Sequence, residues 1–160
     1  MWSRKGSQPR VPIVGALRRI GLTGVMNIRS GRLWQYASEE YNLETFEEVL
    51  VNVRRIWRGW NIVFFVDKHS AQKSPKAVAF ARELGIELRF LPTAASRLNP
   101  MEDLWRYVKN EVIANEPTPN LDATIKIACA HLRSLSPRER LKKAGVLADN
   151  FWLREFVKKK

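Results

Sequence analysis

Hydrophobic and polar positions change their period several times along the chain. Residues 23–28 and 32–36 are short runs rich in strand-forming side chains on either side of a turn at 29–31 that contains a glycine, a pattern that predicts a β-hairpin. From Leu43 to Trp57 apolar residues recur every three or four positions, which predicts an amphipathic helix that ends before Gly59.

A strand, a helix and a second strand are predicted next. The run 61–67 contains five consecutive apolar residues, which is typical of a strand buried on both faces in a parallel sheet. Ser74-Pro75 supplies an N-cap and a first-turn proline for a helix that ends at Leu84. Apolar and charged residues then alternate over 86–90. A strand-helix-strand unit of this length places its two strands parallel in one sheet.

The remainder of the chain predicts helices. The first runs from about Leu98 to Asn115, and a polar, proline-containing break at 116–120 separates it from a helix over 121–133. Ser136-Pro137-Arg138-Glu139 has the form of a capping box and opens a short helix that stops at Gly145. The fold class is therefore α/β, with helices gathered at the C-terminal end.

Charge points to a nucleic-acid partner. Lys and Arg number 28 against 16 Asp and Glu, a net charge of +12, and no acidic residue precedes Glu39. Nucleic acid is the usual partner of such an excess, although a solvated basic surface would have the same composition. A single cysteine, Cys129, leaves no pair for a disulfide. No apolar run approaches a membrane span, and the N-terminus lacks a secretory signal, so we expect a cytoplasmic protein.

Two carboxylates stand out by their positions. Asp67 follows the most apolar strand, and the carboxyl ends of strands are where open α/β sheets place their sites. Glu102 lies in the first turns of a helix. Each has a plain structural explanation, since Asp67 could cap a turn and Glu102 could complement the helix dipole. Together they would form a hard-oxygen site suited to Mg²⁺ or Mn²⁺.

The motifs around these two residues resemble a known family. Asp67 is separated by 34 residues from Glu102, which lies in the motif Leu98-Asn99-Pro100-Met101-Glu102 and is followed by Trp105 and Lys109. This pattern, with Trp2-Ser3-Arg4-Lys5-Gly6 and the turn at Gly31, resembles the DDE transposases of the mariner-related superfamily in its bacterial insertion-sequence branch. The resemblance covers roughly residues 2–115.

The resemblance implies a fold, an activity and a site. It implies a partial RNase H-like catalytic domain over 1–115, a mixed sheet with flanking helices, followed by a C-terminal helical extension over 116–160. It implies a Mg²⁺- or Mn²⁺-dependent endonuclease and strand transferase that acts on transposon ends and target DNA in the nucleoid. Asp67 and Glu102 would be the second and third catalytic carboxylates, both binding metal.

The family's first aspartate lies on a strand upstream of the Trp2–Gly6 segment, so we expect this chain to lack it. The absent strand would lie between the hairpin and the strand that ends at Asp67. The chain alone is therefore expected to be inactive and to need a homodimer or a companion chain that supplies the strand. The alternatives are a non-catalytic basic DNA-binding protein derived from a decayed transposase and an unrelated resolvase-like nuclease.

Several basic residues are candidate DNA contacts. Lys68 directly follows Asp67, where the family usually has asparagine. Arg106 and Lys109 are four and seven positions after Glu102, which in an α-helix puts them on its face, either along a DNA backbone or paired with Glu102. Near the N-terminus, the same role is expected of Arg4 and Lys5.

Overall fold

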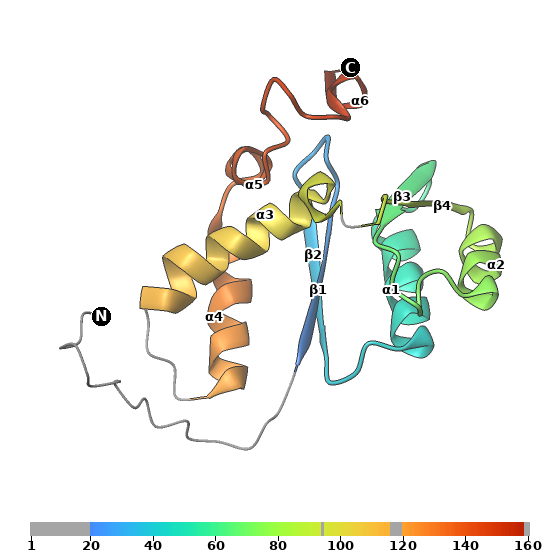
Figure 1. Ribbon diagram of the computed structural model, residues 1–160, viewed down its shortest axis with the longest axis horizontal. Coiled ribbons are helices and arrows are strands. Elements are labelled where there is room, and N and C mark those ends of the chain that lie inside the picture. Colours follow the sequence, from blue (N-terminus) through green and yellow to red (C-terminus); the bar gives the residue numbers. More distant parts are fainter. Residues whose placement is uncertain (1–19, 94, 116–119, 159–160) are drawn as a thin grey trace.

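The computed structural model describes residues 20–93, 95–115 and 120–158 (Figure 1). It is a mixed α/β structure in which the strands of the described residues all lie before residue 91 and only helices follow. The strands and α-helices are β1 (Gly21–Met26), β2 (Leu33–Ser38), α1 (Leu43–Ile56), β3 (Ile62–Val66), α2 (Pro75–Glu83), β4 (Ile86–Phe90), α3 (Pro100–Tyr107), α4 (Leu121–Ser134), α5 (Pro137–Lys143) and α6 (Arg154–Lys158).

The predicted hairpin is confirmed. β1 and β2 pair antiparallel from Gly21 opposite Ser38 to Met26 opposite Leu33. At the turn, the side-chain oxygen of Asn27 accepts hydrogen bonds from two backbone amides, and Gly31 has φ of +68°. Glycine adopts this left-handed conformation without the steric cost that a Cβ would add.

The helix and the strand-helix-strand unit that follow are confirmed as well. Asn42 caps α1 by accepting from the backbone amide of Thr45 at 2.9 Å. Ser74 caps α2, and this helix connects β3 to β4. These two strands pair parallel, with Ile62 opposite Ile86.

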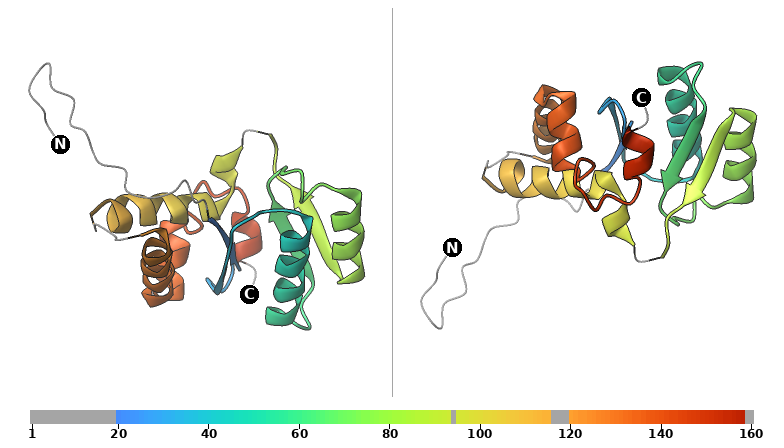
Figure 2. Two further views of the ribbon diagram at one scale, coloured as in Figure 1. Left: turned by 90° about the horizontal axis from the view of Figure 1, so that it is seen from below. Right: turned by 90° about the horizontal axis from the view of Figure 1, so that it is seen from above.

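The prediction that the strand ending at Asp67 is buried on both faces is wrong. Ile62, Phe64 and Val66 of β3 pack into the core formed with α1 and α2, but Val63 on the other face is 45% exposed. Both helices lie on the same side of β3 and β4 in Figure 2, so the described residues leave the second face without a helical layer.

The four strands do not form one continuous sheet. Within the described ranges, β1 pairs only with β2 and β3 only with β4. The predicted α/β composition is therefore found. The described strands, however, form two separate pairs rather than one mixed sheet, and residues of β1 and β3 line a groove.

The predicted helix over 98–115 has a more irregular course. After a short 3-10 helix at Ser96–Leu98 comes α3, capped by Asn99. The chain then changes to a π-helix at Val108–Val112 and a 3-10 helix at Ile113–Asn115. Because a π-helix bonds i to i+5, the α-helical spacing that placed Lys109 on the face of Glu102 no longer applies there.

The hairpin packs against two hydrophobic clusters, and Figure 2 shows it between α1 on one side and α3 and α4 on the other. The facing pair Val25 and Trp34 belongs to the first cluster, centred on α1 and the β3–α2–β4 unit. The next pair, Met26 and Leu33, packs against the second cluster, which is built from α3, α4 and α5. Successive residues of a strand point to opposite faces, so each face of the hairpin serves one cluster.

The C-terminal helices partly match prediction. α4 is capped by Asn120, and α5 opens with the predicted capping box between Ser136 and Glu139. The short helix α6 was not predicted from the sequence. None of the helices in the described ranges is long and apolar enough to cross a membrane.

Candidate catalytic and metal-binding site

Asp67 lies directly after the last residue of β3, and its side chain is exposed. It is held in place by Asn99, whose side-chain nitrogen Nδ2 donates a hydrogen bond to Asp67 Oδ2 at 3.1 Å. Asp67 therefore lies past the end of its strand and has a hydrogen-bond partner 32 residues away in the sequence.

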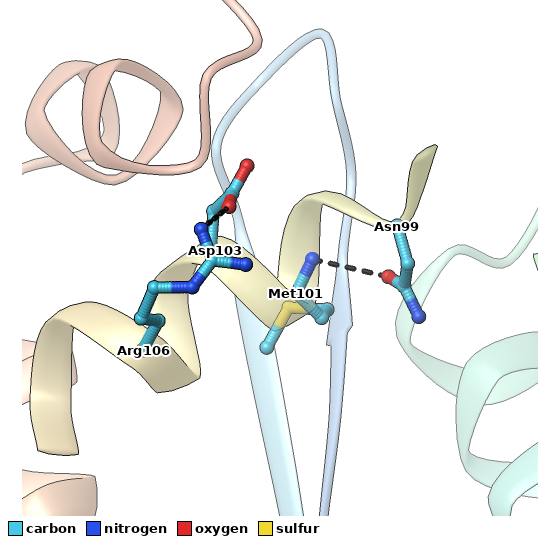
Figure 3. A network of polar contacts seen from close by, with 4 residues as sticks. All are labelled: Asn99, Met101, Asp103 and Arg106. Carbon is cyan, nitrogen blue, oxygen red and sulfur yellow. Dashed lines mark hydrogen bonds and ion pairs between the residues drawn. The ribbon is translucent and has the colours of Figure 1, made fainter. Parts of the chain in front are cut away.

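Asn99 connects the two candidate carboxylates. Its side-chain oxygen accepts from the backbone amide of Met101 at 3.1 Å, which caps α3 (Figure 3). Its backbone oxygen accepts from the amide of Glu102 at 3.0 Å. One residue thus starts the helix that carries Glu102 and also donates a hydrogen bond to the carboxylate of Asp67.

Glu102 lies exposed in the first turn of α3, and both carboxylates line the same groove. The groove has a volume of about 800 Å³. It is lined by β1 and by β3, with side chains of α1 between them. Of the described residues, β2 contributes none to this lining and β4 only Arg89, so the unpaired edges of β1 and β3 face the groove.

The donor set fits a hard divalent cation, but only in part. Carboxylate oxygens are the ligands that Mg²⁺ and Mn²⁺ prefer. Asp67 and Glu102 supply two such side chains in one groove, while the described residues contain no group of three or more His, Cys, Asp or Glu placed to hold a metal ion. The pair would hold a metal weakly and leaves room for another ligand.

The candidate DNA-contacting residues are placed differently from one another. Lys68 points its amine toward the hydroxyl of Thr93, 3.5 Å away. Arg106 pairs with Asp103 at 2.7 Å, so its partner is not Glu102 (Figure 3). Lys109 is exposed in the π-helix. The other two candidates, Arg4 and Lys5, lie outside the described residues.

In a polar and aromatic group beside Asp67, Tyr41 was not found from the sequence. The Tyr41 hydroxyl accepts from Gln72 Nε2 at 2.8 Å, and its ring meets His69 edge-on at 5.1 Å. Burial raises the pKa of Tyr41, and the negative charge of Asp67 raises it further. Tyr41 lies in the connection between hairpin and helix, where no periodic pattern marks it. Asn99 could have been found from its place before Pro100 at a helix start.

One comparison with known proteins identifies the family of this chain. Residues 1–125 match a protein family described as DDE superfamily endonuclease. The match covers more than half of the chain, which therefore belongs to this family. Membership supports a transposase-like nuclease domain, and members of the superfamily typically use divalent metal ions. A search among curated proteins found no relative that matches this chain.

Proposed function

We propose that this chain is the metal-dependent DNA-cutting and strand-transfer part of a bacterial insertion-sequence transposase of the mariner-related type, acting in the cytoplasm at the nucleoid. The observation that carries the proposal is the convergence of Asp67 and Glu102 on one groove, joined through Asn99. Membership in the DDE superfamily endonuclease family supports the same activity.

In this proposal the protein holds and orients the reacting groups. Asp67 and Glu102 would hold Mg²⁺ or Mn²⁺, and a bound pair of such ions activates the attacking oxygen and stabilises the leaving one in phosphodiester transfer. Asn99 limits the rotation of the Asp67 carboxylate by occupying one of its oxygens, which leaves the other free for a metal.

A third carboxylate is expected from a strand that enters the groove. Support comes from β1 and β3: each has an edge that pairs with no strand among the described residues, and residues of both line the groove. Backbone amides and carbonyls on such edges lack partners and favour pairing with an added strand. We propose an RNase H-like sheet completed in this way, with the strand contributed by another polypeptide segment or a second copy of the chain. The chain alone would then be inactive.

Metal binding tests the assignment of the carboxylates. We expect Mn²⁺ to bind the isolated chain weakly, because Asp67 and Glu102 supply only two carboxylate side chains. Paramagnetic broadening of nearby amide signals should be at least about tenfold weaker in Asp67→Asn, which removes one charge while keeping the shape. Asp122→Asn, on α4, is the control and should leave the broadening unchanged. A tight site that survives Asp67→Asn would mean that the carboxylates are assigned wrongly.

A DNA-binding measurement tests whether nucleic acid is the partner of this chain. The net charge of +12 should act through phosphates, so affinity for labelled duplexes should fall steeply with salt and depend little on sequence. Each phosphate contact adds about −0.9 to the slope of log K against log salt. Lys68→Ala and Lys109→Ala should therefore each make this negative slope shallower by about one. Affinity that does not change with salt, or strong preference for one sequence, would count against this expectation.

The second candidate function is non-catalytic DNA binding by a decayed transposase domain. It is favoured by the same positive charge and by the absence, within the described residues, of a three-carboxylate cluster. The metal-binding experiment distinguishes the two functions, because a purely DNA-binding protein would show no Mn²⁺ effect that depends on Asp67.

A further inference from the structure

Trp152, outside the matched family region at 1–125, contacts the strand that precedes Asp67 and the 3-10 helix that precedes α3, on which Glu102 lies. Its indole nitrogen donates a hydrogen bond to the backbone oxygen of Leu98 at 2.9 Å. Its ring meets Phe65 edge-on, with the ring centroids 5.1 Å apart and the planes at 90°. Trp152 is nevertheless 41% exposed, so burial in a core does not explain its position.

Both contacts are close to the site along the chain. Phe65 is two residues before Asp67 on β3, and its side chain lies on the face that α1 and α2 do not cover. Leu98 directly precedes Asn99, the residue that caps α3 and bonds to Asp67. Trp152 therefore joins the strand of Asp67 to the loop that begins the helix of Glu102.

The contacts of Trp152 add a second connection between β3 and the start of α3, beside the hydrogen bond from Asn99 to Asp67. A single side-chain hydrogen bond between exposed groups exchanges with water and fixes distance poorly. The same rigid indole contacts β3 through its edge-on packing with Phe65 and the segment before α3 through its hydrogen bond to Leu98. The segment is anchored beside Trp152 by Leu153, which is buried, and by the backbone oxygen of Phe156, which accepts from Arg29 at 2.7 Å.

We infer that Trp152 is a positioning residue for the nuclease site: it holds Leu98, the last residue of the 3-10 helix, and the adjacent cap residue Asn99 against β3, so that Asp67 and Glu102 face the groove together. This inference rests on the proposed function for its consequence in metal binding. The positioning itself is a property of the metal-free protein and can be measured there.

The test compares Trp152→Phe with Trp60→Phe. Phenylalanine at 152 keeps a ring beside Phe65 but removes the indole donor to Leu98. Trp60 also lines the groove and is 58% exposed, so Trp60→Phe controls for the loss of a tryptophan from this surface. In the metal-free protein, only Trp152→Phe should move the side-chain amide signal of Asn99 toward the position of a free asparagine. Its Mn²⁺ affinity should drop about three- to tenfold, the size of one neutral hydrogen bond.

The outcomes separate the inference from the proposed function. Should both variants shift the Asn99 signal equally, or neither shift it, Trp152 has no positioning role. Should the Asn99 signal move only in Trp152→Phe while Asp67→Asn leaves Mn²⁺ binding unchanged, the positioning stands and the metal assignment fails. The midpoint of urea unfolding is measured for both variants, and a large loss of stability in Trp152→Phe alone, with the Asn99 signal unmoved, would show a purely structural residue.

Discussion

Fusing an apolar strand that ends in Asp to this chain is expected to raise its melting temperature by roughly 5–10 °C and to yield a monodisperse protein. The strand would pair with the open edges of β1 and β3, which face one groove. A ligand present at about 100 times its Kd contributes roughly 2.7 kcal/mol, and each kcal/mol shifts the midpoint of a protein of this size by about 2–4 °C. Calorimetry would measure the melting temperature, and light scattering would measure the state of association.

The control for this experiment is the same fused segment with prolines at alternate positions. Proline has no backbone N–H and cannot complete a strand ladder, so this version should change neither the melting temperature nor self-association. The intact version should also restore Mg²⁺-dependent nicking, lost again in Asp67→Ala or Glu102→Ala. If the 160 residues alone are a stable monomer that the strand leaves unchanged, the groove is not a strand site.

Gly31→Ala is expected to lower the free energy of unfolding by about 2–4 kcal/mol. Gly31 has φ of +68°, where a Cβ is strained, and the added Cβ would lie 2.3 Å from the backbone oxygen of Pro137. Backbone atoms at the start of α5 cannot rotate away as a flexible side chain can. Relief therefore requires the hairpin turn to move off α5, which urea unfolding should record as lost stability.

The stability loss expected in Gly31→Ala has two causes, backbone strain at positive φ and the contact with Pro137, and Gly59→Ala separates them. Gly59 has φ of +81°, but its Cβ would meet nothing within 4 Å, so only the conformational strain remains, about 1 kcal/mol. The difference between the two variants measures the contact of the hairpin turn with Pro137. Equal losses would show that the turn does not depend on this contact.

The local elements could be predicted from the sequence because their signals are local. Ser74 and Ser136 mark helix starts because their side-chain oxygens accept hydrogen bonds from amides three residues ahead, and the structure has both of these bonds. The alternation at 86–90 and the apolar run before Asp67 likewise needed only neighbouring residues. Asp67 and Glu102 were singled out in the same way, from where each lies on its element.

What could not be predicted depends on partners distant in the chain. An apolar strand looks the same whether or not its second face is covered, so the exposure of Val63 followed only from the arrangement of α1 and α2. The contacts of Asp67 with Asn99 and of Phe65 with Trp152 join residues 32 and more positions apart, and no spacing rule links them. The π-helix after Tyr107 breaks the regular period that the pattern had implied.

The shared hairpin has a consequence for how the protein unfolds. Val25 with Trp34 and Met26 with Leu33 are consecutive cross-strand pairs that pack into different clusters. A slip of the hairpin by one residue would turn each of these side chains to the wrong face and damage both clusters together. If the hairpin detaches from one cluster, its contacts with the other cluster are lost as well. The two halves of the molecule are therefore thermodynamically coupled, and we expect them to melt in a single cooperative transition.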